Sequence, residues 1–450
     1  MPKLLRITIV SAACLLAAPK LRDVPVLAAD QARSPATLEA DVRRLIAGLG
    51  NETRSVRIES EKRLLELGPP VLPHLPAPEL LPSISVREAV RRVRRELEQM
   101  QARDSVLPSR VTRAAGGTLG EALADITRET GNRLDAEGLA DALLKQPMDL
   151  RFAATPFWQA LDDIAKKFQL RHEYDASQRG LRLVPLEANH PDLSASVAYG
   201  GAFRIAAPPA VRIRRMNAAR DLARVTLNVS AEPRLRPLFL QFAASDLQAR
   251  SQNKTELPPF TPEATYELAL GEGAGPARLL LEYVLPEGAE VATINLAGKL
   301  NCTAAAGNDQ IRFADVPRLR NVNEVNIARR RGGVTVTLTR VQAAALPSGK
   351  NELRIRAAVS YDAGGPAFES HRTWILHNEV FLEDAAGQRV RLNGGSQTAQ
   401  QGDGGLAIEY RFVDLPDPLP DYAFVYVAPT MIIDVPIEFE IQSLPVRARP

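Results

Sequence analysis

The chain has very little cysteine: Cys14 and Cys302 are the only two among its 450 residues. Cys14 lies in an N-terminal segment that we expect to be removed, so the mature chain is expected to have no intrachain disulfide. Five histidines and one remaining cysteine are too few for a Cys/His metal cluster. We therefore expect a protein that is stabilised by its hydrophobic cores and that binds no metal and no cofactor.

Aromatic residues and excess charge of one sign are also scarce. Phe, Trp and Tyr make up 5% of the chain, and 56 basic residues nearly balance 53 acidic ones, which leaves a net charge of +3. A balanced charge provides no long-range attraction for a polyanion. The composition therefore predicts no nucleic-acid partner.

The common catalytic motifs are missing. The sequence contains no His-Glu-x-x-His zinc helix, no Gly-x-Ser-x-Gly elbow and no phosphate-binding P-loop. His371 and His377 would share one face of a strand, with Glu369 or Glu379 as a further metal ligand, but histidines in such a strand more often belong to a core or a surface. We expect no catalytic residues and a protein that is not an enzyme. A hydrolase whose site assembles from distant residues is the less favoured alternative.

Long apolar runs are absent except near the N-terminus. Lys3 and Arg6 form a short positive region before the apolar run Ile7–Ala18. This run is too short to span a bilayer as a helix and is typical of an export signal. Small residues at Ala28 and Ala29 provide a cleavage site. We expect residues 1–29 to be a signal peptide, the mature chain to be periplasmic or extracellular, and no transmembrane span to remain.

Residues 30–107 have the apolar spacing of helices. One helix is expected over Leu38–Leu49, a second from Glu52 to Leu67 and a third from Ser85 to Arg103. Gly68-Pro69-Pro70 ends the second, because a glycine followed by prolines cannot continue a helix. An early arginine, a Leu-Gly-Pro turn and a charged next helix together resemble the helical repeats of the HEAT class, over about one and a half units.

Residues 108–187 contain one helix pattern twice, 38 positions apart. The apolar stripe of the first copy returns residue by residue in the second: Leu119, Ala122, Leu123 and Ile126, then Phe157, Ala160, Leu161 and Ile164. Strand-like segments flank both copies at Arg133–Ala136, Met148–Ala153, Leu170–Tyr174 and Leu181–Val184. The pattern predicts a duplicated βαβ unit whose two helices pack on a shared sheet.

This stretch resembles the short N-terminal domain of secretins and TonB-dependent receptors. The resemblance rests on "TLGEALADITRETGNRL" and "TPFWQALDDIAKKFQLRHEYD" and covers about a sixth of the chain. In that family the domain is periplasmic and contacts other proteins, so the resemblance implies envelope proteins as partners. No secretin core and no long barrel follows here, so the family's own partner is not implied.

Residues 188–450 change to an alternating pattern with frequent turns. The strands expected include 225–229, 279–284, 334–338, 353–359, 406–412, 422–427 and 437–441. We expect two β-sandwiches, 188–316 and 317–450, that meet near Pro317. Pro436 interrupts the last strand, which is therefore expected at an edge or at a bulge. The whole chain is predicted to be a multidomain α+β protein.

Four aromatic residues are the candidate partner-binding residues. Trp158 follows the buried Phe157 by one position, where the first copy has Gly120, so it would either anchor a partner or pack within the chain. Tyr422, Phe424 and Tyr426 alternate and share one face of a strand, which would suit a polysaccharide if that face were exposed. From these patterns we expect an exported scaffold of the cell envelope. A ligand- or polysaccharide-binding sandwich is the alternative, and the oligomeric state stays open.

Overall fold

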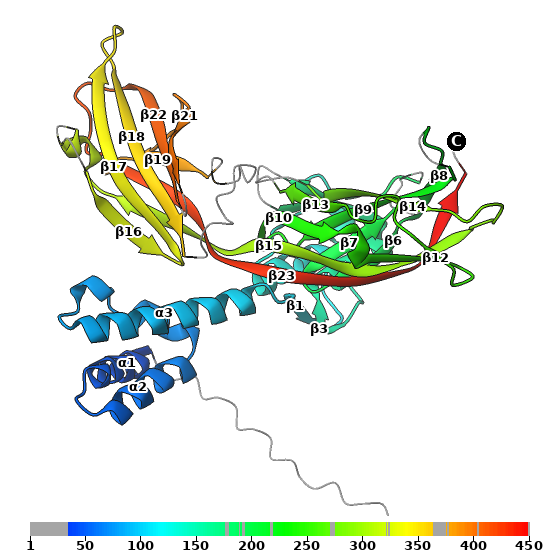
Figure 1. The fold of residues 1–450 in the computed structure, drawn as a ribbon, viewed down its shortest axis with the longest axis horizontal. Coiled ribbons are helices and arrows are strands. Elements are labelled where there is room, and N and C mark those ends of the chain that lie inside the picture. The colour runs from blue at the N-terminus through cyan, green and yellow to red at the C-terminus, as the bar shows by residue number, and fades with distance from the viewer. Residues whose placement is uncertain are drawn as a thin grey trace, which may run out of the picture.

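The structure is a computed structural model, and it describes residues 35–448 except 176–179, 189, 191–193, 217–218, 271–274, 321, 323–324, 363–374, 376–377 and 403–404. The expected signal peptide lies outside these residues. The chain is a mixed α/β protein built mostly from strands (Figure 1). Its buried apolar side chains form four large clusters and one small one.

The first cluster belongs to the helical segment. Helices α1 (Pro35–Leu49), α2 (Arg54–Glu66) and α3 (Ile84–Ser105) are joined by two short 3-10 helices, η1 (Pro69–His74) and η2 (Pro78–Leu80). The second helix ends before Gly68, whose φ of 75° suits glycine, and Pro69 then begins η1. The three predicted helices are confirmed. In Figure 1, α3 extends from this cluster toward the β-rich part of the molecule.

The duplicated pattern forms two 12-residue helices, α4 (Leu119–Thr130) and α6 (Phe157–Phe168). Thr118 caps α4 by accepting from the Glu121 amide, the Glu121 carboxylate accepts from the Thr118 amide, and Gly131 ends the helix in the left-handed conformation. Both apolar stripes are buried in one cluster, with Leu123 3% and Leu161 0% exposed. The repeated helices are therefore confirmed.

The prediction of one shared sheet for this unit is wrong. Strands β1 (Arg110–Arg113) and β3 (Phe152–Pro156) form a two-stranded sheet. A separate sheet has the order β2-β5-β4, from Leu134–Asp135, Gly180–Pro185 and Leu170–Asp175; α5 (Asp141–Leu144) lies between the two copies. The two helices pack in one core, but the strands beside them form two separate sheets. Strand pairing depends on residues far apart in the chain, and the periodicity of a helix does not specify it.

Replacing Leu161 by alanine is expected to lower the free energy of unfolding of the full chain by about 2–5 kcal/mol, because the change leaves a cavity in this core. Leu123→Ala should cost a similar amount. Urea denaturation would measure both, with the 80% exposed Leu80→Ala as a control that changes stability by less than about 0.5 kcal/mol. If Leu123→Ala and Leu161→Ala were as mild as the control, the stripes would not form this core.

The remaining strands surround two larger cores. The strands of the first are β6 (Ser196–Gly200), β7 (Phe203–Ala207), β8 (Ala210–Ile213), β9 (Leu222–Ala231), β10 (Arg236–Ala243), β11 (Leu247–Ser251), β12 (Glu256–Leu257), β13 (Thr265–Ala269) and β14 (Ala277–Val284). Those of the second are β16 (Ile327–Arg331), β17 (Val334–Ala345), β18 (Asn351–Tyr361), β19 (Val380–Glu383), β20 (Arg389–Arg391), β21 (Ser396–Gly402) and β22 (Gly405–Leu415). We call them the first and second lobes.

Two long strands belong to both lobes. β15 (Thr293–Phe313) and β23 (Ala423–Arg447) pair antiparallel, and each buries one half in the first core and the other half in the second. Figure 1 shows the pair crossing from one lobe to the other. The expected boundary near Pro317 therefore does not separate the cores, because the chain returns to the first lobe through Val435–Leu444. The two segments predicted as 422–427 and 437–441 are one continuous strand.

In the part of the chain that the structure describes, Pro436 has a ladder partner on one side only, as predicted for an edge position. It faces Asn301 of β15, and among the described strands no other pairs with β23 at this position. Proline has no N–H to donate, so an edge position costs no ladder hydrogen bond.

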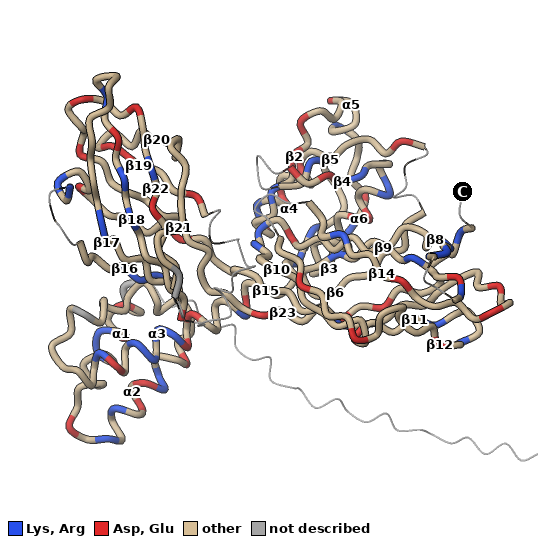
Figure 2. The backbone as a smooth tube through the Cα atoms, turned by 45° about the horizontal axis from the view of Figure 1, so that its top comes forward, with Lys and Arg blue, Asp and Glu red and all other residues tan. Residues whose placement is uncertain are grey.

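The duplicated unit lies against the first lobe. Figure 2 shows α4, α6 and the β2-β5-β4 sheet gathered over β9 and β14, while α1–α3 lie beside the second lobe. Acidic and basic residues are interspersed along the tube in the same view. The contact between the duplicated unit and the first lobe encloses a cavity, described below.

Candidate functional site

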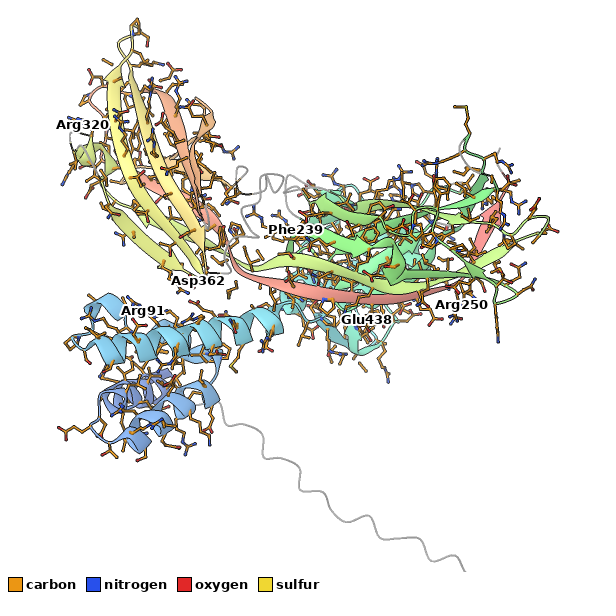
Figure 3. All side chains as sticks on the ribbon, in the orientation of Figure 1. Arg91, Phe239, Arg250, Arg320, Asp362 and Glu438 are labelled. Atoms are coloured by element: carbon orange, nitrogen blue, oxygen red, sulfur yellow. The ribbon has the colours of Figure 1, made fainter. Side chains whose placement is uncertain are left out.

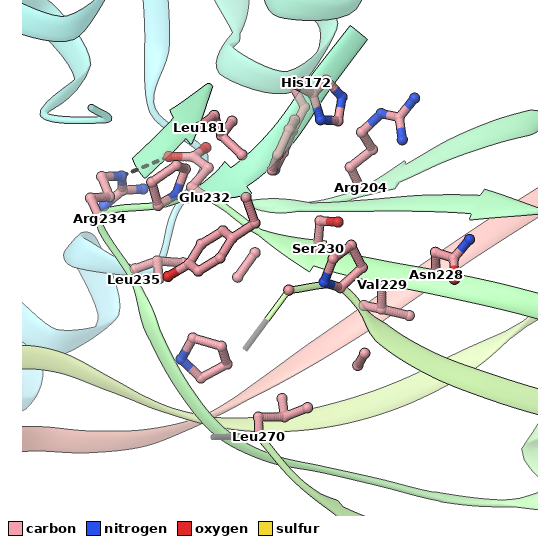
Figure 4. Close-up of a pocket in the computed structure, with 18 of the residues that line it drawn as sticks. His172, Leu181, Arg204, Asn228, Val229, Ser230, Glu232, Arg234, Leu235 and Leu270 are labelled. Atoms are coloured by element: carbon pink, nitrogen blue, oxygen red, sulfur yellow. Dashed lines mark hydrogen bonds and ion pairs between the residues drawn. The ribbon is translucent and has the colours of Figure 1, made fainter. Parts of the chain in front are cut away.

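A cavity of about 460 Å³ lies between the duplicated unit and the first lobe. One wall is made by α6, β4 and β5 and carries Trp158, His172 and Leu181; the other is made by β7, β9 and β10 and the turn between the last two. Figure 4 shows His172 and Arg204 side by side at one end, the Glu232–Arg234 pair at another, and Leu270 opposite them. The volume lies within the usual range for ligand sites.

Trp158 forms part of this wall and is only 2% exposed. Its indole Nε1 donates to the backbone oxygen of Ala202 in the first lobe at 3.2 Å. Its ring lies edge-on to Phe157 at 5.3 Å and beside His172 at 5.2 Å. The side chain therefore packs within the chain and joins two parts of it, and its ring also borders the cavity.

A charge cluster next to Trp158 joins the same two parts. Asp162 of α6 accepts from the hydroxyl of Tyr199 at 2.6 Å and from Nε of Arg204 at 2.8 Å, and His172 Nε2 lies 3.5 Å from its other oxygen. Burial by itself would raise the pKa of Asp162, but hydrogen bonding from His172 and the Arg204 guanidinium outweigh it and lower that pKa to about 2. The carboxylate is therefore charged throughout the physiological range and holds Arg204 in place.

A second buried cluster centres on Glu232, which is 1% exposed and directly follows β9. Its carboxylate accepts from the backbone and hydroxyl of Ser109 at 2.9 and 2.6 Å, from the Asn132 amide at 3.1 Å and from Arg234 Nε at 2.6 Å. Arg234 also donates to the backbone oxygens of Ser105, the last residue of α3, and of Leu107. This cluster ties the helical segment, the duplicated unit and the first lobe together.

A third contact joins the second lobe to the helices. Arg330 of β16 donates to Glu98 of α3 at 3.1 Å and to Asp362 at 2.6 Å. Figure 3 shows Asp362 at the lower end of the second lobe, next to α3. Burial lowers the pKa of Arg330, but the carboxylates of Asp362 and Glu98 raise it by more. Arg330 therefore stays positively charged.

Tyr422, Phe424 and Tyr426 are not on a surface. They are 4%, 0% and 0% exposed and lie in the core of the second lobe, where Tyr410 packs against both Phe424 and Tyr426. Phe424 and Tyr426 lie on one face of β23, which Tyr422 directly precedes, and all three share a core with residues of the five-stranded sheet β16-β17-β18-β22-β21. The condition for a sugar-binding row, an exposed face, is therefore not met at these residues.

The other chemical candidates have no site geometry in the described chain. Cys302 is fully buried, and burial raises the pKa of its thiol to about 12, so it is protonated at neutral pH and a poor nucleophile. Among the described residues, no group of three or more His, Cys, Asp or Glu is placed to hold a metal ion. His371, His377 and Glu369 lie outside those residues. No described helix is long and apolar enough to cross a membrane.

Sequence reasoning identified Trp158 but missed the polar residues of the site. The alternation of Glu232 and Arg234 around a proline was the one local signal, since it places both side chains on one side of an extended segment. Their partner Asn132 lies 100 residues earlier than Glu232, and Arg204 lies 42 residues after Asp162. No spacing rule connects such residues before the chain is folded.

Comparisons with known proteins add little to this description. No family model and no curated protein matches the chain. Among solved structures, the protein called pT26-6p is 8% identical, over 65% of this chain and 69% of that one, with a TM-score of 0.14. A likeness at this TM-score carries no argument about fold or function, so the proposals below rest on the residues themselves.

Proposed function

We propose that this chain is an exported, non-enzymatic scaffold protein of the cell envelope that holds partner proteins in a defined arrangement. The observation that carries the proposal is the set of polar contacts across the boundaries between its parts. Glu232 joins three parts, Asp162 joins two of them again, and Arg330 attaches the second lobe to α3. With β15 and β23 shared by both lobes, these contacts keep the outer surfaces in constant relative positions.

The N-terminal sequence and the resemblance of residues 108–187 to a periplasmic contact domain support the cellular location. The experiment is to purify the tagged full chain from its native cell after chemical cross-linking, and to sequence its N-terminus. We expect a chain that lacks the first 28 or 29 residues and that co-purifies with an envelope protein. An intact Met1 in a cytoplasmic fraction, or no co-purifying protein, would refute the proposal.

A variant pair tests whether the arrangement of the parts matters. Arg330→Gln removes the ion pair between the second lobe and α3 without touching a hydrophobic core, and we expect it to lower partner recovery several-fold. Arg250→Gln removes the same charge from an exposed position on β11 and should leave recovery unchanged. Equal recovery with both variants would show that partners bind one part of the chain alone.

The cavity favours a second candidate function, the binding of a small ligand. Its volume and its position between two parts of the chain are typical of ligand sites. A polysaccharide is the less suitable ligand, because the aromatic residues that the structure describes are all buried or half-buried. Sugar-binding surfaces use exposed aromatic rings, so the chemistry of the cavity has to be derived from its own wall.

A further inference from the structure

Most of the charges in the cavity wall are paired with opposite charges. Arg204 is paired with Asp162, Arg234 with Glu232, and Glu173 with Arg171. Arg236, at the β10 side, donates to the neutral amide oxygens of Asn378 at 2.9 Å and Asn308 at 3.4 Å. A charged ligand would leave water for charges most of which already have a charged partner, and burying the charge of the ligand is costly.

Much of the remaining wall is apolar. Ten of its side chains bring only carbon to the cavity, and Leu181, Val229, Leu235 and Leu270 are the largest of them. Ser230 and Asn228, on one face of β9, add a hydroxyl and an amide, and the ring of Trp158 adds an aromatic surface. Such a wall gains free energy mainly by removing apolar surface of a ligand from water.

We propose that this cavity binds a small, uncharged and largely apolar molecule, whose few polar atoms accept hydrogen bonds near Ser230 and Arg204. The inference rests on the ligand-binding candidate function and is independent of the scaffold proposal. A cavity of about 460 Å³ accommodates a molecule of drug-like size. Free small molecules are the source that we commit to, rather than a side chain of a protein partner.

The test uses the full chain and two aromatic probes of similar size, neutral N-phenylnaphthylamine and anionic anilinonaphthalene sulfonate. Trp158 and Trp374 are the only tryptophans, so in a Trp374→Phe background the emission of Trp158 reports occupancy of the cavity. We expect the neutral probe to quench Trp158 in a saturable manner and to bind about tenfold more tightly than the anionic one. No saturable quenching, or a preference for the anion, would overturn the proposal.

Two tryptophan substitutions on one strand locate the site. Ser230→Trp fills the cavity from β9 and should weaken binding of the neutral probe by about tenfold or more. Thr226→Trp introduces the same side chain on the same face of β9, four residues away and outside the cavity wall, and should leave binding unchanged. Because both variants add a tryptophan, binding is measured here by the fluorescence of the neutral probe. If Ser230→Trp bound this probe as tightly as the unsubstituted chain, the site would lie elsewhere. If Ser230→Trp does not fold, the Trp158 quenching experiment decides alone.

A third variant tests the charge argument. Asp162→Asn removes the negative charge that neutralises Arg204, while Asp162 itself does not line the cavity and the amide oxygen of asparagine can still accept from Arg204. We expect the affinity for the anionic probe to rise about tenfold, while the affinity for the neutral probe changes by less than about threefold. An unchanged affinity for the anion in a folded Asp162→Asn variant would show that the paired charges do not set the selectivity. Failure of the probes to bind leaves the co-purification experiment on the scaffold unaffected.

Discussion

Replacing Glu232 by alanine is expected to lower the free energy of unfolding by about 3–5 kcal/mol, because it removes one partner from a buried charge cluster and leaves the others unpaired. Arg234 would lose its carboxylate, and Ser109 and Asn132 would lose their acceptor. The carboxylate is 1% exposed and joins three parts of the chain, so this loss is among the largest that a single polar substitution should cause. Urea denaturation of the full chain is the measurement.

Glu438→Ala is the matched control for this prediction. Glu438 lies on β23, its side chain is 77% exposed, and its only described ion pair is with Lys299 at 4.0 Å (Figure 3). An exposed pair contributes about 0–1 kcal/mol, so the control should barely change the denaturation midpoint. Should Glu232→Ala cost no more than Glu438→Ala, the Glu232 cluster would be open to solvent and would not join the parts of the chain.

Replacing Trp158 by alanine is expected to cost about 3–5 kcal/mol, the range for truncating a buried aromatic side chain. The side chain is 2% exposed, and both its contact with Phe157 and its hydrogen bond to Ala202 would be lost. Thermal and urea denaturation should both show the loss. Trp158→Phe keeps an aromatic ring but not the donor, and it should therefore cost substantially less than alanine.

The Trp158 experiment also separates two interpretations of this residue. A tryptophan that anchors a partner would lower partner recovery when truncated and would leave the melting temperature unchanged. The packing of Trp158 within the chain predicts instead that Trp158→Ala lowers the melting temperature strongly. An unchanged melting temperature for Trp158→Ala would return Trp158 to the surface role that its position beside the apolar stripe first suggested.

The sequence predicted the structure best for features that depend on residues close together in the chain. The stripe that begins at Leu119 and returns at Phe157 predicted two helices of the right position and face, since each depends on residues three or four apart. Gly131 and Gly68 marked helix ends for the same reason, because only the backbone of glycine adopts their conformations readily. Alternation likewise predicted that Tyr422, Phe424 and Tyr426 share one face of a strand.

Predictions from neighbouring residues failed for features that depend on a distant segment of the chain, namely the exposure of a strand face, the length of a strand and the pairing of strands. The alternation of Tyr422, Phe424 and Tyr426 does not say whether their face meets solvent or a second sheet, and the structure covers it. Pro436 suggested an interrupted pattern, yet pairing with β15 over most of its length keeps β23 continuous. The strands of the duplicated unit form two sheets rather than one because pairing partners are chosen across the chain.

Local sequence patterns predicted the main helices of this protein, several of its strands, and the apolar faces of both. These properties follow from backbone preferences and from side-chain spacing within a few residues. What each face packs against, and where β15 and β23 end, depends on the folded chain. Trp158 finds its acceptor 44 residues away and Glu232 finds Asn132 at 100 residues, and the cavity exists only where those segments come together. Such contacts form because folding buries polar groups that must then find partners, and no short-range pattern specifies which partner lies within reach.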